Sequence, residues 1–487
     1  MESKGINQRM VERVKRIYEE TKMIVKTRNG FTDSFWTKKG VRQGCALSPL
    51  LFSIYIAELD KMMERRGVGG IELGKDRIWN IAYADDIVLV AKNRVAMLDM
   101  MDTLKKFLKE RRLELSTEKT KIVVFNRKGR ERKEKWKWKD KGIEEVKEFK
   151  YLGFTFNQAG NYKAHIRDLY KKGRVALNKV WGLGERICRD DFVRRWALFR
   201  YLVQSVMSYG VEIWGWEEKE KLERIMMDYV RWIFRLDFCT PRYIIMYELG
   251  MEKLKIGWGI RAKRYEEKIR NSSEERLIKK CWEEKEERGG KDLYWKERES
   301  YYNRNGWGVE RVKEGMEGGW DMEGEIVKRE RDVQKQWIES KIREAKYNKR
   351  YKDIRKIGEG HKYLEKSSLI RMGAKAGGEV RALIKLRCGN LELENKYWLE
   401  EEERKCVMCG KEQDEMYHYM YTCEWGKRWF EEMDSMEGRG KERIWDDEID
   451  EIKGKVLKRM WREREGKIKE RERVGEKEKE KGQSEIG

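Results

Sequence analysis

Hydrophobic positions follow two different spacings along the first part of the chain. Apolar side chains recur every three to four residues within 7–23 and 96–112, which is typical of amphipathic helices. Residues 40–67 also predict a helix, because Ser48 can cap its start and Gly67 can end it. These three segments therefore predict three helices within the first 112 residues.

Other segments alternate between apolar and polar side chains and predict β-structure, namely residues 24–41, 79–91, 120–125 and 150–156. The first contains Asn29-Gly30, a dipeptide that favours a tight hairpin turn. The second predicts a strand, a two-residue turn and another strand, and the last two predict one strand each. Together the elements predict an α+β domain over residues 1–157, with helices on one face of a mostly antiparallel sheet.

Beyond residue 157 the pattern is mainly helical, basic and rich in tryptophan. The chain has only two prolines, which suits long helices. The Gly-rich residues 303–324 predict a linker. We expect the charged tail to be solvated and either helical or disordered, with nonspecific phosphate contacts as the lesser alternative. The predicted regions are a helical region (158–270), a basic helical connector (271–400), a cysteine-bearing segment (401–430) and the charged tail (431–487).

The formal net charge is +23 over 487 residues. Such an excess favours nucleic acid as the partner, because Lys and Arg that neutralise phosphates release bound counterions. The alternative is a basic helical scaffold whose charge serves only solubility. No apolar run approaches the roughly 20 residues of a membrane span, and no secretion signal is present. The sequence therefore predicts an intracellular protein without a membrane partner.

Two adjacent acids, Asp85 and Asp86, lie between the apolar runs of residues 79–91. Asp is common in turns, so an ordinary solvated turn is one interpretation. Against it, two neighbouring negative charges repel each other unless a cation neutralises them. Carboxylates at the tip of a hairpin are suitable ligands for Mg²⁺, and paired metal ions catalyse phosphoryl transfer. The pair is therefore a candidate metal site.

Near the C-terminus, Cys406-x2-Cys409-x8-His418-x4-Cys423 has the spacing of a zinc site. Three thiolates and one imidazole complete a tetrahedral shell with no open position, so a Zn²⁺ ion there would be structural. The alternative is four unrelated buried residues. His165, His361 and the other five cysteines show no ligand spacing and are interpreted as structural.

Four blocks in order, residues 40–52, 82–86, 113–125 and 149–154, resemble the palm of reverse transcriptases. They are most similar to the enzymes of non-LTR (LINE-type) retrotransposons of the insect jockey and R1 kind. Weaker resemblance continues through residues 208–216, 240–250 and 387–398 to the cysteine cluster. The resemblance implies a partial polymerase palm over 1–157, a thumb-like helical region over 158–270 and a small zinc knuckle over 401–430.

The resemblance also implies roles for individual residues. Asp85 corresponds to a metal-binding Asp, with Asp86 beside it, and Tyr83 would lie near the primer end. The residues implied to contact template, nucleotide or primer are Arg42, Gln43 and Gly44 in a loop and helix start, Lys119 near the triphosphate, and Tyr151, Leu152 and Gly153 in the primer grip. Without the resemblance, the first three could be an ordinary helix entry, and Lys119 could be an exposed lysine at a strand edge.

The function implied is that of an RNA-directed DNA polymerase extending a primer on element RNA. Its partners would be an RNA template, a DNA primer or target and dNTPs, with Mg²⁺ or Mn²⁺ at the palm and Zn²⁺ at the knuckle. The knuckle would help to grip nucleic acid, and the family implies a nuclear or cytoplasmic location.

The family pattern includes a further Asp on a palm strand upstream of the 40–52 block. The acids before that block do not fit the pattern, and they are Glu2, Glu12, Glu19, Glu20 and Asp33. We therefore expect the fingers and the first palm strand to be missing, and the chain alone to polymerise DNA poorly. The alternative is a non-catalytic nucleic-acid-binding remnant that uses the zinc knuckle and the basic helices.

Overall fold

The computed structural model describes the chain apart from residues 1–4, 20, 29, 38–39, 43, 126–134, 346–347, 349–350, 355–376, 392, 394–395, 397, 435–439, 447–448 and 485–487. The chain divides into two compact units, each of which is described by itself. The first unit contains residues 1–147 and 272–289, and the second contains 148–271 and 290–487. Some residues named above lie outside the described residues, namely Glu2, Glu20, Asn29, Gln43 and His361.

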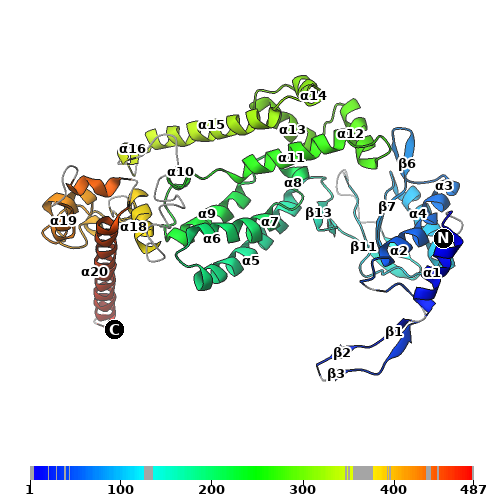
Figure 1. Ribbon diagram of the computed structural model, residues 1–487, viewed down its shortest axis with the longest axis horizontal. Coiled ribbons are helices and arrows are strands. Elements are labelled where there is room, and N and C mark those ends of the chain that lie inside the picture. Colours follow the sequence, from blue (N-terminus) through cyan, green and yellow to red (C-terminus); the bar gives the residue numbers. More distant parts are fainter. Residues whose placement is uncertain are drawn as a thin grey trace. The chain divides into compact units, whose positions relative to one another are not determined.

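The first unit mixes short helices with small strand pairs (Figure 1). Its elements are α1 (Gln8–Glu19), β1 (Thr21–Met23), β2 (Lys26–Thr27), β3 (Gly30–Phe31), β4 (Phe35–Thr37), α2 (Ser48–Ile56), α3 (Glu58–Arg66), β5 (Ile71–Leu73), β6 (Asp76–Ile78), β7 (Asn80–Tyr83), β8 (Asp86–Leu89), α4 (Arg94–Glu110), β9 (Lys121–Ile122), β10 (Trp136–Trp138), β11 (Lys141–Glu145) and α12 (Leu277–Glu287).

The strands form small separate sheets rather than the single sheet that the sequence predicts. Among the described residues, β1–β4, β2–β3, β5–β6 and β7–β8 are antiparallel pairs, and β10–β11–β9 is a three-stranded sheet. β11 and β9 pair in parallel. The α+β class is therefore confirmed, whereas one continuous sheet is wrong for the described part, because the paired segments are only two to five residues long.

Helices α3 and α4 carry the core of the first unit. The Asn93 side chain caps α4 by accepting a hydrogen bond from the Ala96 N–H at 2.9 Å. The buried cluster joins these helices to β10 and β11, and consists of Ile56, Leu59, Met63, Met100, Met101, Leu104, Phe107, Leu108, Trp136, Trp138 and Ile143. Trp79, Ile87 and Leu89 pack against it from the edges of the 79–91 segment. This core thus supports the acidic hairpin from one side.

The second unit is mainly helical (Figure 1). Its elements are β12 (Glu148–Tyr151), β13 (Phe154–Asn157), α5 (Lys163–Ile187), α6 (Phe192–Leu198), the π-helix η2 (Phe199–Gln204), α7 (Ser205–Met207), α8 (Val211–Trp214), α9 (Glu220–Phe234), α10 (Arg242–Glu248), α11 (Leu254–Arg270), α13 (Leu293–Arg304), α14 (Val309–Glu317), α15 (Met322–Arg343), α16 (Tyr351–Ile354), α18 (Gly377–Arg387), η6 (Glu402–Arg404), η7 (His418–Thr422), α19 (Lys427–Asp434), η8 (Gly440–Trp445) and α20 (Glu451–Ser484).

The Gly-rich segment 303–324 is folded, so the linker interpretation is wrong. It contains α14, and Trp307, Val312 and Met322 are buried in a cluster around Trp216. The apolar side chains spaced among the glycines are therefore core residues of the second unit.

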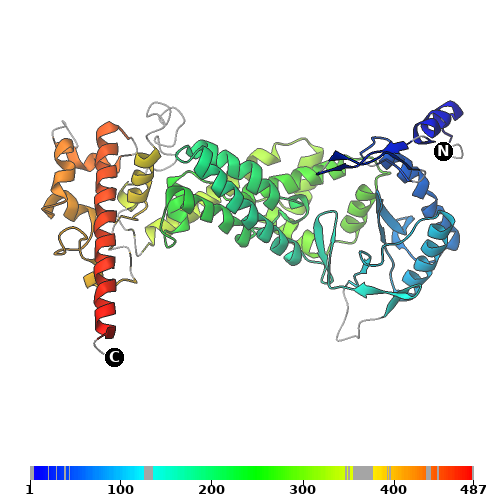
Figure 2. The same ribbon diagram turned by 90° about the horizontal axis from the view of Figure 1, so that it is seen from below.

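The segment predicted as a solvated tail is also part of the fold up to at least Arg464. Val456, Leu457 and Met460 on α20 are fully buried. Figure 2 shows α20 as a long helix with α18 and α19 packed beside its first half. The predicted helix is therefore confirmed for this stretch, whereas the predicted full solvation is wrong, because these side chains are buried.

A buried ion pair fixes α20 to the cysteine-bearing segment. The Arg464 guanidinium donates from Nη1 and Nη2 to the two carboxylate oxygens of Asp414, both at 2.7 Å. It also donates to the Leu391 carbonyl at 2.7 Å. Asp414 further accepts hydrogen bonds from the Val407 N–H at 3.1 Å and the Leu393 N–H at 3.0 Å. Burial opposes the charged form of Asp414, but Arg464 holds the pKa of this carboxyl below its usual range.

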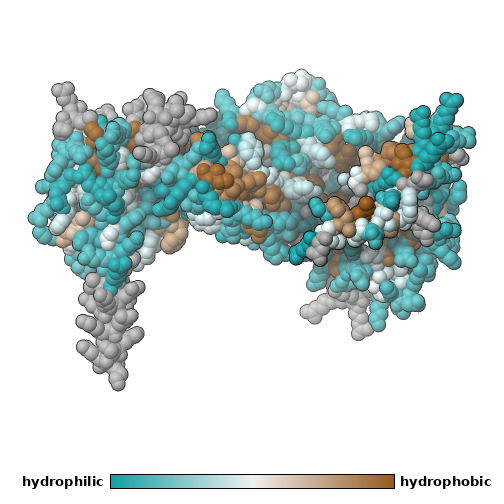
Figure 3. Space-filling view, turned by 60° about the horizontal axis from the view of Figure 1, so that its bottom comes forward, coloured by the Kyte–Doolittle hydropathy of each residue, from teal (hydrophilic) through white to brown (hydrophobic). Residues whose placement is uncertain are grey.

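Hydrophobic areas interrupt the mainly hydrophilic surface in the view of Figure 3. In the described part of the chain, no helix is both long enough and apolar enough to cross a membrane.

We predict that Arg464→Met destabilises the chain by about 3–5 kcal/mol, because it leaves the Asp414 carboxylate buried without its cation. Urea unfolding of the full chain, followed by circular dichroism, measures the change. The matched control is Arg462→Met, an exposed arginine on the same helix, which should change stability by about 0.5 kcal/mol or less. Equal unfolding midpoints for the two variants would contradict the assignment.

Candidate functional site

The acidic pair lies at the tip of the β7–β8 hairpin. Tyr83 pairs with Asp86 and Ala82 pairs with Ile87, so Ala84 and Asp85 form the two-residue turn. Ala84 has φ 53°, a left-handed conformation that is unusual for a residue with a Cβ. Strain of this kind clusters at functional sites. The predicted strand–turn–strand is confirmed, with Asp86 as the first residue of β8 rather than part of the turn.

Strand alternation sends the acids away from the core. Paired residues share a face of a sheet, and neighbours along a strand point to opposite faces. Ile87 packs against the core cluster, so Asp86 and its partner Tyr83 point to the other side. Tyr83 is 65% exposed, and Asp85 and Asp86 are exposed as well. Within the described residues, neither carboxylate forms an ion pair or accepts a side-chain hydrogen bond.

Two adjacent carboxylates offer oxygen ligands of the kind that Mg²⁺ prefers. In the part of the chain that the structure describes, the one group of three or more ligating side chains close enough to share a metal is the cysteine cluster. The hairpin therefore contributes two carboxylates by itself. It could hold one divalent ion weakly, with water completing the shell.

The Arg42–Gly44 loop precedes α2 in the same unit. The Arg42 Nε donates to the Thr21 hydroxyl at 3.0 Å, and its guanidinium lies 5.5 Å from the centre of the Tyr18 ring. Gly44 has φ 81°, and a Cβ built on it would meet no atom within 4 Å other than those of its chain neighbours. The Ser48 hydroxyl, expected to cap the helix, instead donates to the Arg42 carbonyl at 2.6 Å. The template-contacting role of this loop stays a prediction.

Lys119 is exposed in a turn just before β9. It is therefore not on a strand, contrary to the alternative interpretation of an edge lysine. No ion pair involves Lys119 among the described residues. Its role near a triphosphate stays a prediction.

Tyr151, Leu152 and Gly153 belong to a hairpin in the second unit. The sequence predicts one strand over 150–156, and this is wrong: β12 and β13 are antiparallel, with Tyr151 paired to Phe154. The turn residues Leu152 and Gly153 have φ 45° and 82°. Both positive angles match the turn type that suits a two-residue hairpin. The tight Gly turn of the predicted primer grip is therefore present.

Two residues of the helical part of the unit, Tyr209 in the turn between α7 and α8 and His165 on α5, hold this turn in place. The Tyr209 hydroxyl donates to the Leu152 carbonyl. The buried His165 accepts from the Thr155 N–H through Nδ1 at 3.3 Å, so its Nε2 carries the proton and donates to the Tyr209 carbonyl at 3.0 Å. Burial lowers the pKa of His165, which keeps the ring neutral. His165 is thus structural, as its lack of ligand spacing predicts.

The four predicted zinc ligands converge in the second unit. One ligand atom from each of Cys406, Cys409, His418 and Cys423 lies within 4.8 Å of the others. The Cys406 and Cys423 sulfurs are 3.9 Å apart, and the Cys409 sulfur is 3.1 Å from the His418 Nε2. Ligands of a tetrahedral Zn²⁺ ion lie roughly 3.5–3.8 Å apart. The arrangement therefore fits zinc, and Gly410 makes the expected turn with φ 73°.

The surroundings of these ligands also fit a cation. The His418 Nδ1 lies 2.8 Å from the Glu412 carboxylate, and Thr422 donates to the same carboxylate at 2.9 Å. Such a partner orients a metal-binding imidazole. Burial raises the pKa of the Cys423 thiol to about 12, whereas for Cys409 nearby N–H groups and His418 outweigh burial and lower the pKa to about 7. The buried Cys423 thiol therefore becomes a thiolate near neutral pH only with a cation beside it.

Aromatic side chains near the cluster have different roles. Tyr419 is fully buried and bonds to Asp414 and Arg464, so it belongs to the core rather than to a binding surface. Tyr417 and Trp425 are exposed. The Arg428 guanidinium lies 4.6 Å from the centre of the Trp425 ring.

Comparison with known proteins identifies the N-terminal part of the chain. Residues 6–156 match the family described as reverse transcriptase (RNA-dependent DNA polymerase). This stretch contains the acidic hairpin and every predicted nucleotide-, template- and primer-contacting residue. Residues 6–156 are therefore a reverse transcriptase domain.

Relatives specify the kind of reverse transcriptase. The chain is 24% identical over 285 residues to the "RNA-directed DNA polymerase from mobile element jockey" of Drosophila funebris, covering 54% of this chain and 29% of the relative. It is 31% identical over 138 residues to the "Retrovirus-related Pol polyprotein from type-1 retrotransposable element R2" of Nasonia vitripennis, covering 26% and 13%. It is 22% identical over 222 residues to the "Probable RNA-directed DNA polymerase from transposon BS" of Drosophila melanogaster, covering 44% and 24%.

Residues 6–156 thus belong to the reverse transcriptase family, and these three relatives are proteins of non-LTR retrotransposons. The alignments span between 13% and 29% of the length of these three relatives. The family predicted from the sequence blocks is thereby confirmed.

We predict that the purified chain binds one Zn²⁺ ion and that Cys406→Ser abolishes stoichiometric binding, because a closed site loses one of its four ligands. Elemental analysis after dialysis against a weak chelator measures the stoichiometry. Cys388→Ser, a buried cysteine outside the cluster, is the matched control and should retain the metal. Equal zinc content in the two variants would contradict the site.

Proposed function

We propose that the chain carries the metal-binding hairpin of an RNA-directed DNA polymerase, with Asp85 and Asp86 as the carboxylates. The observation that carries this proposal is the position of both acids on the outward side of a two-residue turn, inside the reverse transcriptase match. Divalent ions bound to such carboxylates neutralise the attacking and leaving oxygens of nucleotidyl transfer. The ion of choice is Mg²⁺ or Mn²⁺.

In this proposal the residues around the hairpin bind and orient the nucleic acid. Tyr83 shares a face with Asp86 and is well exposed, so it can touch a primer end near the ions. Gly44 leaves room for a close approach of a base pair, because nothing beyond its chain neighbours lies within 4 Å of where a Cβ would be. Lys119 is exposed and could pair with a triphosphate.

The turn at Leu152 and Gly153 is proposed to hold the primer strand. Tyr209 fixes it, and a Cβ on Gly153 would lie 3.0 Å from the Tyr209 ring. A rigid turn of this kind orients a bound strand with little loss of conformational freedom. The substrates would be an RNA template, a DNA primer and dNTPs.

The chain is proposed to polymerise DNA poorly by itself. Two-metal catalysis needs ions clamped in register at about 3.5–4 Å. Among the described residues, no third ligating side chain lies close enough to share a metal ion with the two exposed carboxylates of the hairpin. Removing one preorganised group from such a site slows the reaction by about 10²–10³-fold.

A primer-extension assay on poly(A) with an oligo(dT) primer tests both parts of this proposal. We predict that Mg²⁺-dependent extension by the chain is no faster than that of its Asp85→Ala variant. Robust synthesis that Asp85→Ala abolishes would contradict the expected inactivity while supporting the metal site.

Direct metal binding separates the site from the activity. Titration with Mn²⁺, followed by electron paramagnetic resonance, should detect a weak ion with a Kd of about 1 mM, on the scale of sparse carboxylate sites. Asp85→Asn should remove it, and Asp102→Asn, an exposed acid on α4, should not. Unchanged binding in Asp85→Asn would contradict the hairpin as the ligand.

The second candidate function is nucleic-acid binding through the zinc knuckle without catalysis. It is supported by the exposed Tyr417 and Trp425 and by Arg428 beside the Trp425 ring. Exposed aromatic rings stack on unpaired bases, and arginine adds charge.

We predict salt-dependent binding of single-stranded RNA that Trp425→Ala weakens about 10-fold, on the scale of one lost stacking contact. Fluorescence anisotropy at several salt concentrations measures the affinity. Cys406→Ser should weaken it further, because the knuckle loses its metal. Tyr419→Phe, a change in the core beside the knuckle, is the control for a purely structural effect. Equal affinities for the chain and its Trp425→Ala variant would exclude this surface.

A further inference from the structure

One aromatic pair in the second unit is exposed without being part of either site above. Phe238 is 84% exposed, the most of any large hydrophobic side chain that the structure describes. Trp398 is 44% exposed, and the two ring centroids are 5.9 Å apart with their planes inclined by 37°. Phe238 lies between α9 and α10, and Trp398 lies beyond α18. Two distant parts of the chain therefore meet to present these rings to solvent.

The loop that carries Phe238 is held firmly. The Asn390 carboxamide accepts from the Asp237 N–H at 2.7 Å and donates to the Cys388 carbonyl at 3.0 Å. The same carboxamide bonds to the hydroxyl of Thr240, and both Asn390 and Thr240 are buried. The Lys396 Nζ lies 3.5 Å from the Asp237 carboxylate. The exposed rings thus stand on a fixed base, which limits the entropy lost on binding.

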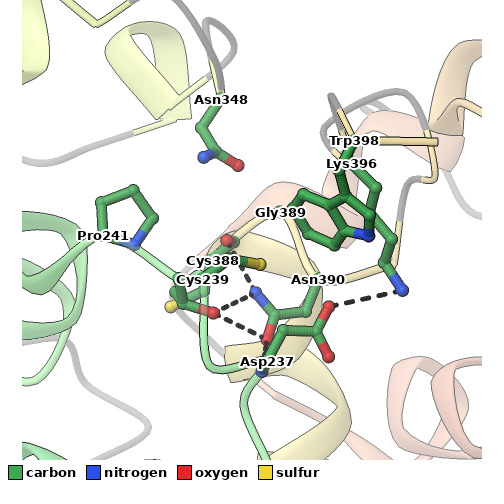
Figure 4. A pocket seen from close by; sticks show the side chains of 10 residues that line it. Asp237, Cys239, Pro241, Asn348, Cys388, Gly389, Asn390, Lys396 and Trp398 are labelled. Atoms are coloured by element: carbon green, nitrogen blue, oxygen red, sulfur yellow. Dashed lines mark hydrogen bonds and ion pairs between the residues drawn. The ribbon is translucent and has the colours of Figure 1, made fainter.

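The adjoining cavity is too small for a nucleobase. Asn390, Pro241 and Trp398 are among the residues that line it (Figure 4), and its volume is about 70 Å³. That is room for roughly two water molecules, and small-molecule pockets are typically about 300 Å³ or more. A ligand of these rings would therefore lie on them rather than enter the cavity.

The surroundings of the pair are basic. Arg235 is exposed at the end of α9 and forms no ion pair among the described residues. It adopts φ 53° and ψ 44°, where Gly or Asn would be less strained. Burial lowers the pKa of Lys385, and the positive charges of Arg235 and Arg381 act in the same direction against Glu465 and Asp237. Arg235 and Lys396 thus lie within three residues of Phe238 and Trp398 along the chain.

We infer that Phe238 and Trp398 form a stacking platform for the bases of a single-stranded nucleic acid, with Arg235 and Lys396 beside its phosphates. The inference rests on the proposed function for the class of partner, but on residues outside the hairpin and the knuckle. Every base has a π-face, so such a platform accepts RNA or DNA of any sequence. A duplex hides its base faces and would gain only the phosphate contacts.

Photocrosslinking locates the contact on the full chain. Oligonucleotides of 4-thiouridine and 4-thiothymidine are irradiated with the zinc-loaded protein, and the adducts are mapped by mass spectrometry. Adducts on peptides that contain Phe238 or Trp398 are expected with the RNA probe, the DNA probe or both. Adducts confined to other peptides would overturn the inference.

Anisotropy measures the energetic effect. Phe238→Ala combined with Trp398→Ala should weaken single-strand binding about 10-fold or more and leave duplex binding unchanged. Arg235→Ala should reduce the slope of log affinity against log salt by about 1. The matched control is Trp320→Ala, since Trp320 is 49% exposed in the same unit. An effect of the control equal to that of the platform variant would overturn the inference.

Two further measurements distinguish the platform from a contact between copies of the chain and from the two proposed sites. If sedimentation shows self-association that Phe238→Ala disrupts, with nucleic-acid affinity unchanged, the pair is a contact between copies and the inference fails. The Mn²⁺ titrations of the chain and of its Asp85→Asn variant test only the proposed hairpin. Their outcome does not bear on the platform. Crosslinks at Phe238 in the Cys406→Ser variant would likewise establish the platform independently of the knuckle.

Discussion

The alternation of side chains along paired strands is the constraint on which the acidic hairpin depends. Ile87 must face the core of α3 and α4, and this forces Asp86 and Tyr83 to the opposite side. A slip of one residue in the register would bury Asp86 and expose Ile87. The turn at Ala84 fixes that register at the cost of a left-handed residue. The apolar face therefore supplies the stability, and the acids are free for chemistry.

Acidic residues serve opposite purposes in the two units. Asp414 is fully buried, receives two hydrogen bonds from Arg464 and accepts backbone N–H groups as well. A charge desolvated in this way must be matched, so its role is to fix α20 against the cysteine cluster. Asp85 and Asp86 are solvated and unmatched by protein cations among the described residues. Their environment suits a ligand that arrives from solution.

Local patterns predicted the elements whose signals lie within a few residues. The β7–β8 hairpin, the amphipathic α4 and the zinc-type spacing follow from periodicity, turn position and ligand chemistry. The folded segment 303–324 and the packed part of α20 could not be predicted in that way, because burial there depends on distant partners. Asp414 and Arg464 are 50 residues apart. The strand break at Leu152 was missed because its turn lacks the Asn-Gly or Asp-Gly signal.

The weak resemblance over residues 208–216 acquires a physical meaning from the second hairpin. Tyr209 closes the turn at Leu152, and Gly210 has φ 70° beneath it. A Cβ on Gly210 would lie 3.2 Å from the Phe154 ring, which stacks on His165. The positive φ and this close approach together favour glycine at the start of α8. Tyr209 of this stretch anchors the turn through its hydroxyl, and its carbonyl accepts from the neutral His165, so both contacts of the stretch serve the position of the hairpin.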